Sequence, residues 1–298
     1  MLGGRDGISN ISGAELRRRV HEIMKCRVNR DFDRMMRHFS RDVVVYYTCS
    51  KKGLFRPGVW RGREAFRENM RLTDIEYQPL DGEIRETLVD GNRVAVRWRS
   101  VWRHVGTGKQ YTLEMAHFMR WENDVVVEVH EFLDRLGFYD PIVTSMMTLD
   151  QIISPPSPGL DRAEITLKLE ALVNFSPSGP DLAMLRDLCS PSIVCEFVGD
   201  RARIPYSGRH IGVHSLASII REIGVEFHQV QYETVEILVE GGRIALRRKV
   251  EWRHHGTSLT GGLELADFAR VEDGKIVELI EYRDSDAVLA ISGDLEPA

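Results

Sequence analysis

An internal repeat limits what this chain of 298 residues can fold into. Residues 89–134 align without a gap on residues 239–284, and 20 of the 46 positions are identical. Chance alone would give about three matches, so the alignment indicates duplication of one folding unit. Two domains of about 150 residues each also suit the length of the chain.

A proline-rich linker separates the two copies. Pro155, Pro156 and Pro158 lie close together, and proline fixes φ and removes a backbone donor, so neither a helix nor a central strand continues there. We therefore expect a disordered tail (1–12), a first domain (13–140), a linker (141–160), a second domain (161–290) and a second tail (291–298).

The composition is that of an ordinary globular chain. Its 43% apolar and 29% charged residues exclude collagen-like, disordered and coiled-coil classes. No apolar run is long enough to span a membrane and no apolar signal core follows the first residues, so we expect a cytoplasmic protein with no membrane partner. We expect reduced core thiols at the four cysteines, which form no CxxC pair: Cys26, Cys49, Cys189 and Cys195.

Charge and motifs exclude further classes. The first 150 residues carry a net charge of +3 and the rest −8, which is not the balance of a nucleic-acid-binding protein and leaves a polyanion site as a minor alternative. The sequence has no glycine-rich phosphate loop, no Ser-His-Asp signature and no His/Cys metal-ligand spacing. We therefore expect no nucleotide, no metal and no other cofactor.

Each repeat is expected to begin with helices and to continue as a sheet. Ser12 and Glu15 form a capping box ahead of apolar residues at helical spacing, and a second helical stretch is predicted from Phe32 to Phe39. Further elements are predicted at 43–47 (strand), near 62–66 (helix) and in long alternating stretches that end in turns such as 273–274. The predicted class is α+β, with helices on one face of a curved antiparallel sheet.

Three segments carry a family resemblance. Residues 62–66, 90–98 and 267–278 resemble the SnoaL-like branch of the nuclear transport factor two-like superfamily of cone-shaped α+β domains. The resemblance covers both repeats and implies two tandem cones that form an internal pseudo-dimer, with domain 1 paired to domain 2. Members of this superfamily are similar in shape but include polyketide cyclases, ketosteroid isomerases, epoxide hydrolases, dehydratases and non-catalytic binding modules, so the fold does not fix the function.

Strand alternation places ionisable residues in apolar rows. In the penultimate strand His117 is predicted to share a face with Leu113, Met115, Met119 and Trp121. In the last strand Glu131 is predicted to share a face with Val125, Val127, Val129 and Leu133. The corresponding rows of the second repeat are Leu263, Leu265, Asp267, Ala269 and Val271, and then Lys275, Val277, Leu279, Glu281 and Arg283.

An ionisable group in apolar surroundings has a displaced pKa, and proton transfer at carbon needs a base poised near neutrality. The predicted catalytic residues are therefore His117, Glu131, Asp267 and Glu281. The family resemblance implies polar residues on these two strands, one of them an acid/base carboxylate; the last strand here carries glutamate where the cyclases usually carry aspartate. The alternative is that His117 and Glu131 only bond to each other and fill a closed core.

The first repeat is expected to hold the better pocket, because the second places Arg248 and Arg283 where the first has Trp98 and Leu133. The predicted pocket-lining residues are Trp98, Trp102, Met115, Met119, Trp121 and Trp252. His104 and His254, at strand ends, are expected to bond near turns. Ladders of opposite charges are expected on the other face of each sheet. The family resemblance implies that the two repeats meet through this face. The residues are Arg97, Arg103, Glu114, Arg120 and Glu128 in the first repeat and Arg247, Arg253, Glu264, Arg270 and Glu278 in the second.

Two function classes remain open from the sequence. The first is a small-molecule enzyme of the cyclase, isomerase or dehydratase kind, which holds an apolar carbonyl compound and moves a proton. The second is a ligand-binding or scaffold protein of the same fold without turnover.

Overall fold

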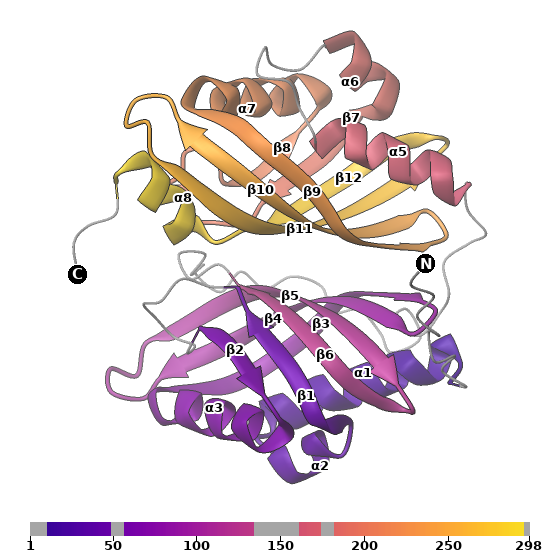
Figure 1. Ribbon diagram of the computed structural model, residues 1–298, viewed down its shortest axis with the longest axis vertical. Helices are drawn as coiled ribbons and strands as arrows, with labels where there is room; N and C mark the ends of the chain where they lie inside the picture. Colours follow the sequence, from indigo (N-terminus) through magenta and orange to yellow (C-terminus); the bar gives the residue numbers. More distant parts are fainter. Residues whose placement is uncertain (1–10, 49–56, 134–160, 174–181, 295–298) are drawn as a thin grey trace, which may run out of the picture. The chain divides into compact units, whose positions relative to one another are not determined.

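The computed structural model describes residues 11–48, 57–133, 161–173 and 182–294. It divides into two compact units, unit 1 built on residues up to Glu131 and unit 2 on residues from Pro156 onward. Each unit holds a six-stranded sheet with helices before it (Figure 1). The predicted α+β class and the duplication are confirmed. No helix in the described part of the chain is long and apolar enough to cross a membrane.

Unit 1 packs its helices against one face of its sheet (Figure 1). The strands follow the order β2-β1-β6-β5-β4-β3. The pairing of β1 with β6 is parallel, which departs from the predicted antiparallel sheet. A parallel pair needs a long crossover, and β2, α3 and three further strands provide it here. The elements are α1 (Gly13–Val28), α2 (Phe32–Met36), β1 (Phe39–Tyr47), β2 (Gly58–Arg61), α3 (Arg63–Glu76), β3 (Tyr77–Asp90), β4 (Arg93–His104), β5 (Gln110–Glu122) and β6 (Val125–Leu133).

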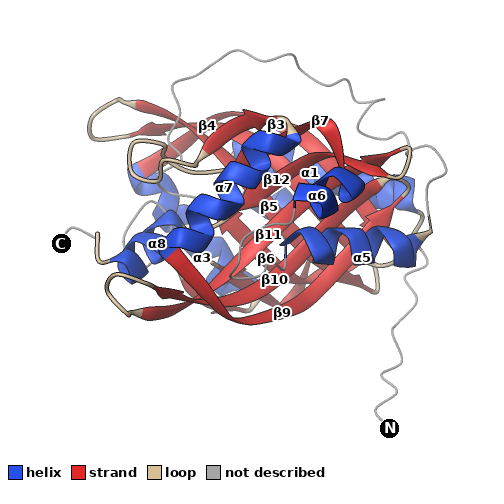
Figure 2. Ribbon diagram, turned by 90° about the horizontal axis from the view of Figure 1, so that it is seen from above, coloured by secondary structure: helices blue, strands red, loops and turns tan. Residues whose placement is uncertain are grey.

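Unit 2 repeats this topology, with strand order β8-β7-β12-β11-β10-β9 and the parallel pair at β7 and β12. Figure 2 shows its helices α5, α6, α7 and α8 in blue beside the red strands. The elements are α5 (Arg162–Val173), α6 (Leu182–Leu188), β7 (Cys189–Phe197), β8 (Gly208–Ile211), α7 (Val213–Glu226), β9 (Phe227–Glu240), β10 (Arg243–His254), β11 (Thr260–Glu272), β12 (Lys275–Tyr282) and α8 (Ser285–Ser292). The expected linker 141–160 lies outside the described residues.

Local signals set several element boundaries. The Ser12 hydroxyl accepts a hydrogen bond from the Glu15 amide at 3.2 Å, so the predicted N-cap of α1 is confirmed. The predicted helix from Phe32 to Phe39 was too long: α2 ends at Met36, and Phe39 starts β1. Phe39 is 2% exposed and pairs with β6, so sheet packing overrides helical spacing there.

The predicted apolar rows largely form the cores. In unit 2 the core contains the predicted β11 row apart from its carboxylate: Leu263, Leu265, Ala269 and Val271. The last strand departs from strict alternation, because Ile276 rather than Val277 joins the core with Leu279. The register of β11 with β12 shifts between Arg270 and Val271, and this bulge moves the start of β12 to the other face.

Candidate active site

His117 on β5 and Glu131 on β6 lie in contact in unit 1. The distance from His117 Nε2 to Glu131 Oε2 is 3.2 Å, and the two side chains are 9% and 12% exposed. The contact lacks hydrogen-bond geometry, and Glu131 Oε1 has no hydrogen-bond partner among the residues that the structure describes. Catalytic hydrogen bonds are often poorly aligned before substrate binds, so this arrangement is compatible with acid/base work.

Strand register brings the pair to one apolar wall. Val96 lies opposite His117 and Trp98 opposite Met115 across the β4–β5 pairing, while Tyr47 of β1 lies opposite Glu131. The rings of Trp98 and His117 are 6.1 Å apart between centroids.

A cavity of about 40 Å³ adjoins this wall. Its lining includes both members of the pair, His117 and Glu131, and four of the predicted pocket residues, Trp98, Trp102, Met115 and Met119. The other two predicted residues lie elsewhere: Trp121 is fully buried outside the lining, and Trp252 belongs to the core of unit 2. Helices complete the lining with Ile23, Met24, Arg27, Met35, Phe66, Met70 and Thr73, and the sheet adds Phe39, Tyr47 and Val129.

Arg27 is the charged residue of the cavity lining that the sequence did not predict. Its guanidinium donates a hydrogen bond from Nη2 to Asp74 Oδ1 at 2.8 Å and lies 4.8 Å from the centre of the Trp102 ring. A signal was present in the sequence, because Arg27 follows Ile23 by four residues and Met24 by three. It therefore continues the apolar stripe that α1 turns toward the sheet.

Unit 2 fills the corresponding positions with an ion-pair cluster. Arg248 Nε lies 2.6 Å from Asp267 Oδ2, and Arg248 Nη2 lies 2.6 Å from Glu281 Oε2. Arg283 Nη2 lies 2.7 Å from Glu281 Oε1. All four residues are buried, so the two predicted carboxylates do come together, but with arginines between them and beside them.

Burial raises the pKa of Asp267 to about 6, and the Arg248 guanidinium opposes that rise. The neighbouring Glu281 charge raises the pKa of Asp267 by a smaller amount. Removal of this carboxyl group from water is therefore the larger cause of the rise. The arginines hold both carboxylates in place, which favours a structural role for this cluster.

The turn histidines behave as predicted. His104 Nδ1 accepts a hydrogen bond from the Thr107 amide at 3.1 Å, and His254 Nδ1 accepts one from the Thr257 amide at 3.0 Å. The two histidines shape the same turn in both repeats and stand apart from the cavity lining.

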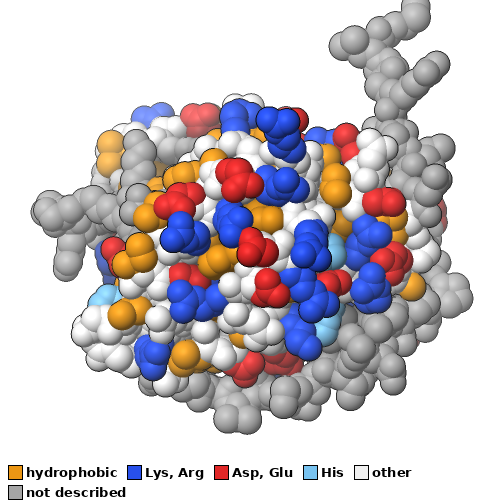
Figure 3. All heavy atoms as spheres, turned by 90° about the horizontal axis from the view of Figure 1, so that it is seen from below, with side chains coloured by type: hydrophobic (Ala, Val, Ile, Leu, Met, Phe, Trp, Pro, Cys, Tyr) orange, Lys and Arg blue, Asp and Glu red, His pale blue; other side chains and the backbone are white. Residues whose placement is uncertain are grey.

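Charge ladders form on the other face of each sheet. Arg120 Nη2 lies 3.3 Å from Glu128 Oε2, and in unit 2 Arg270 Nε lies 3.7 Å from Glu278 Oε2. Figure 3 shows a further charged surface, on the side where α2 and α3 lie in Figure 1, with basic and acidic side chains interspersed. Interspersed basic and acidic side chains keep a surface soluble without giving it a strong electrostatic potential of one sign.

The thiols described by the structure are buried and unpaired: Cys26, Cys189 and Cys195. Burial raises the pKa of Cys189 to about 12. Cys49 lies outside the described residues. Within the described part of the chain, no group of three or more His, Cys, Asp or Glu side chains could hold a metal ion.

A family model described as the SnoaL-like domain matches residues 20–129 and 174–279, together more than half of the chain. No curated protein matches the sequence. Among solved structures, a putative SnoaL-like polyketide cyclase from Mesorhizobium loti is 17% identical over 41% of this chain and 99% of that one, with a TM-score of 0.34. A protein with a ketosteroid isomerase-like fold from Catenulispora acidiphila, in complex with trimethylamine, is 15% identical over 46% of this chain and 100% of that one, with a TM-score of 0.37.

Proposed function

The chain belongs to the SnoaL-like domain family, and from this premise we propose that unit 1 is an enzyme site in which His117 and Glu131 transfer a proton on an apolar carbonyl compound. The observation that carries the proposal is the 3.2 Å contact of these two side chains at the wall of a cavity lined by tryptophan and methionine. An enclosed apolar site with a few convergent polar groups is the usual form of a small-molecule site.

The proposed chemistry needs no group beyond the chain and the substrate. Glu131 orients the imidazole and stabilises its charged form, and His117 removes a proton from the carbon next to the carbonyl. The same imidazolium returns that proton to another atom of the resulting enolate, so the charge and atoms balance over the cycle. Trp98 and Trp102 hold the apolar body of the substrate by contact.

The size of the cavity sets a condition on binding. At about 40 Å³ it is far smaller than the several hundred Å³ of a drug-sized pocket. Five methionines line it, namely Met24, Met35, Met70, Met115 and Met119. Methionine side chains rearrange readily, so we propose that they move aside as the ligand enters.

A scaffold role is the second candidate, and it applies to unit 2. The arginine cluster occupies the positions of the acid/base pair and its wall, which supports a structural rather than catalytic copy. We propose that unit 2 pairs with unit 1 through the sheet faces that carry the charge ladders. Three apolar residues on that face, Ala95, Ala116 and Phe118, recur unchanged as Ala245, Ala266 and Phe268, as an isologous contact requires.

We also propose that the protein is located in the cytoplasm. Buried thiols without disulfide partners, such as Cys189 and Cys195, suit a reducing compartment.

The test is hydrogen exchange at carbon. Hydrophobic ketones that stabilise the protein against heat are incubated with it in D₂O, and NMR follows exchange of the protons next to the carbonyl. We expect wild type to catalyse exchange and His117→Ala to lose it. His104→Ala, the same change at a turn histidine, should retain the wild-type rate. Ligands that bind without any catalysed exchange would assign unit 1 to the binding-module class.

A further inference from the structure

We infer that the ligand of the unit 1 cavity carries a carboxylate, and that Arg27 binds it. This inference rests on the proposed function in that it names a ligand class for the same cavity. It goes further by giving that cavity a second polar end, which the apolar carbonyl compound expected from the sequence does not require.

The first observation is that Arg27 is a buried cation. The residue is 6% exposed, and it lies on the helix face that lines the cavity. An arginine cannot lose its proton in a protein, so its charge must be compensated where it stands.

The second observation is that Arg27 shares its carboxylate partner with a second arginine. Asp74 Oδ1 accepts from Arg27 Nη2 at 2.8 Å, and Asp74 Oδ2 accepts from Arg30 Nε at 2.9 Å. Two guanidinium groups thus share one carboxylate whose side chain is 1% exposed. The Arg30 side chain is 48% exposed and that of Arg27 is 8% exposed, so Arg27 is the cation of the two that lies in the interior.

The third observation is an unused donor. Arg27 Nη1 is buried and has no hydrogen-bond partner within the described residues. A buried donor on a charged group is costly to leave without an acceptor, and native proteins rarely do so. A ligand oxygen in the cavity would satisfy it, and a carboxylate would also neutralise the charge.

The surroundings of Arg27 select the rest of the ligand. The guanidinium lies 4.8 Å from the centre of the Trp102 ring and 5.6 Å from that of Phe32, which holds its plane in place. Glu131 lines the same cavity and repels an anion, so the carboxylate belongs at the Arg27 end and the reacting carbon near His117. Trp98 and Met115 lie along the strands between Trp102, which the guanidinium contacts, and His117, and they suit a flat apolar body. The ligand class is therefore an aromatic or alicyclic carboxylic acid.

The experiment uses matched probes on the full chain. A panel of aromatic and alicyclic carboxylates, such as 2-naphthoate, is titrated beside the corresponding primary amides, such as 2-naphthamide, by calorimetry at neutral pH. We expect at least one carboxylate to bind about tenfold or more tighter than its amide, as a charged hydrogen bond predicts. Arg27→Gln should abolish that preference. Arg30→Gln, which removes the other partner of Asp74, should keep it.

A crystal structure of the wild-type chain with the preferred carboxylate provides a test that does not depend on the folding of Arg27→Gln. A carboxylate oxygen within hydrogen-bond distance of Arg27 Nη1 is the expected result. The inference is overturned if no carboxylate binds better than its amide, if the preference survives in Arg27→Gln, or if the bound carboxylate lies away from Arg27. Proton exchange on neutral ketones would be untouched by such a result, so failure of this inference is distinguishable from failure of the proposed function.

Discussion

Trp98 and Arg248 occupy equivalent positions in β4 and β10, opposite Met115 and Leu265 respectively. The tryptophan ring lines the cavity beside His117. The arginine instead reaches both carboxylates of unit 2, at 2.6 Å each. The same fold is thus used once around a cavity with an acid/base pair and once around a neutralised ion-pair cluster.

Replacing the central arginine of that cluster should destabilise unit 2 strongly. Arg248→Met leaves Asp267 without its guanidinium partner in a fully buried place, and breaking a buried pair costs about 3–5 kcal/mol. Native-state hydrogen exchange of the β10–β12 amides measures this loss in unit 2 directly. Arg270→Met, which removes the half-exposed ion pairs with Glu272 and Glu278, should change the stability by under about 1 kcal/mol. Equal effects of the two changes would mean that the cluster does not hold unit 2 together.

A methyl group at Gly82 should disturb the cavity wall. A Cβ there would meet both the Trp98 ring and the Val28 side chain at 2.8 Å, and Trp98 lines the cavity. We expect Gly82→Ala to cost about 1–3 kcal/mol and to weaken ligand binding. Chemical denaturation and ligand titration measure the two effects.

The matched control is Gly224→Ala in α7, where the added Cβ meets nothing within 4 Å. That change should stabilise the protein by about 0.5–1 kcal/mol, because alanine favours a helix over glycine. If Gly82→Ala were as well tolerated, Trp98 would not be fixed in the wall as described.

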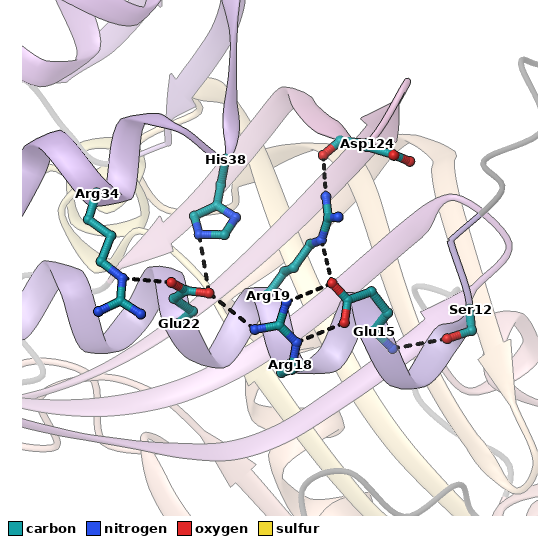
Figure 4. A network of polar contacts seen from close by, with 8 residues as sticks. All are labelled: Ser12, Glu15, Arg18, Arg19, Glu22, Arg34, His38 and Asp124. Atoms are coloured by element: carbon teal, nitrogen blue, oxygen red, sulfur yellow. Dashed lines mark hydrogen bonds and ion pairs between the residues drawn. The ribbon is translucent and has the colours of Figure 1, made fainter.

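The first turn of α1 should contribute a pH-dependent term to stability. Hydrogen bonds from Arg18, and then from Arg19, lower the pKa of Glu15 to about 2 (Figure 4). A carboxyl whose pKa is lower in the folded state stabilises the fold above its ordinary pKa of 4.5, and this contribution is lost as the pH falls toward 2. Because the group is near the surface, Glu15→Gln should cost under about 1 kcal/mol at neutral pH.

The measurement is the difference in unfolding free energy between wild type and Glu15→Gln from pH 6 down to pH 2. The difference should shrink across the acid range. Glu68→Gln, which removes one exposed contact with Arg71 in α3, should show a smaller difference at neutral pH. A constant gap at all pH values for Glu15→Gln would contradict the assigned role of its charge.

Strand alternation was enough to predict most of the residues of the candidate site. Residues two apart face the same way, so the positions of His117 and Glu131 on their strands were enough to predict that they share the cavity wall with Met115 and Met119. The same rule failed at Ile276, because a bulge adds one residue without any glycine or proline to mark it.

Long-range partners could not be predicted in this way. An arginine on an apolar stripe often buries only its aliphatic stem and keeps its charged head in water, so the position of Arg27 in the sequence did not show that its charge is buried. The ion pair with Asp74, which lies 47 residues later, shows it. Helix α8 was likewise missed: it ends at Ser292, and Ile291 packs in the core so closely that a Cβ on Gly261 would lie 2.6 Å from it. The domain boundaries stay a prediction.

The most direct test of the central claim is a comparison of the proton-exchange rates of wild type, His117→Ala, Glu131→Gln and the double variant on one identified substrate, with circular dichroism to show that each is folded. The account predicts that each single change lowers the rate by about 10²–10⁴-fold and that the double variant is no slower than the slower single variant, because the two side chains act as one unit. Folded single variants that both exchange at the wild-type rate would contradict it, and would make His117 and Glu131 a polar pair that fills the core.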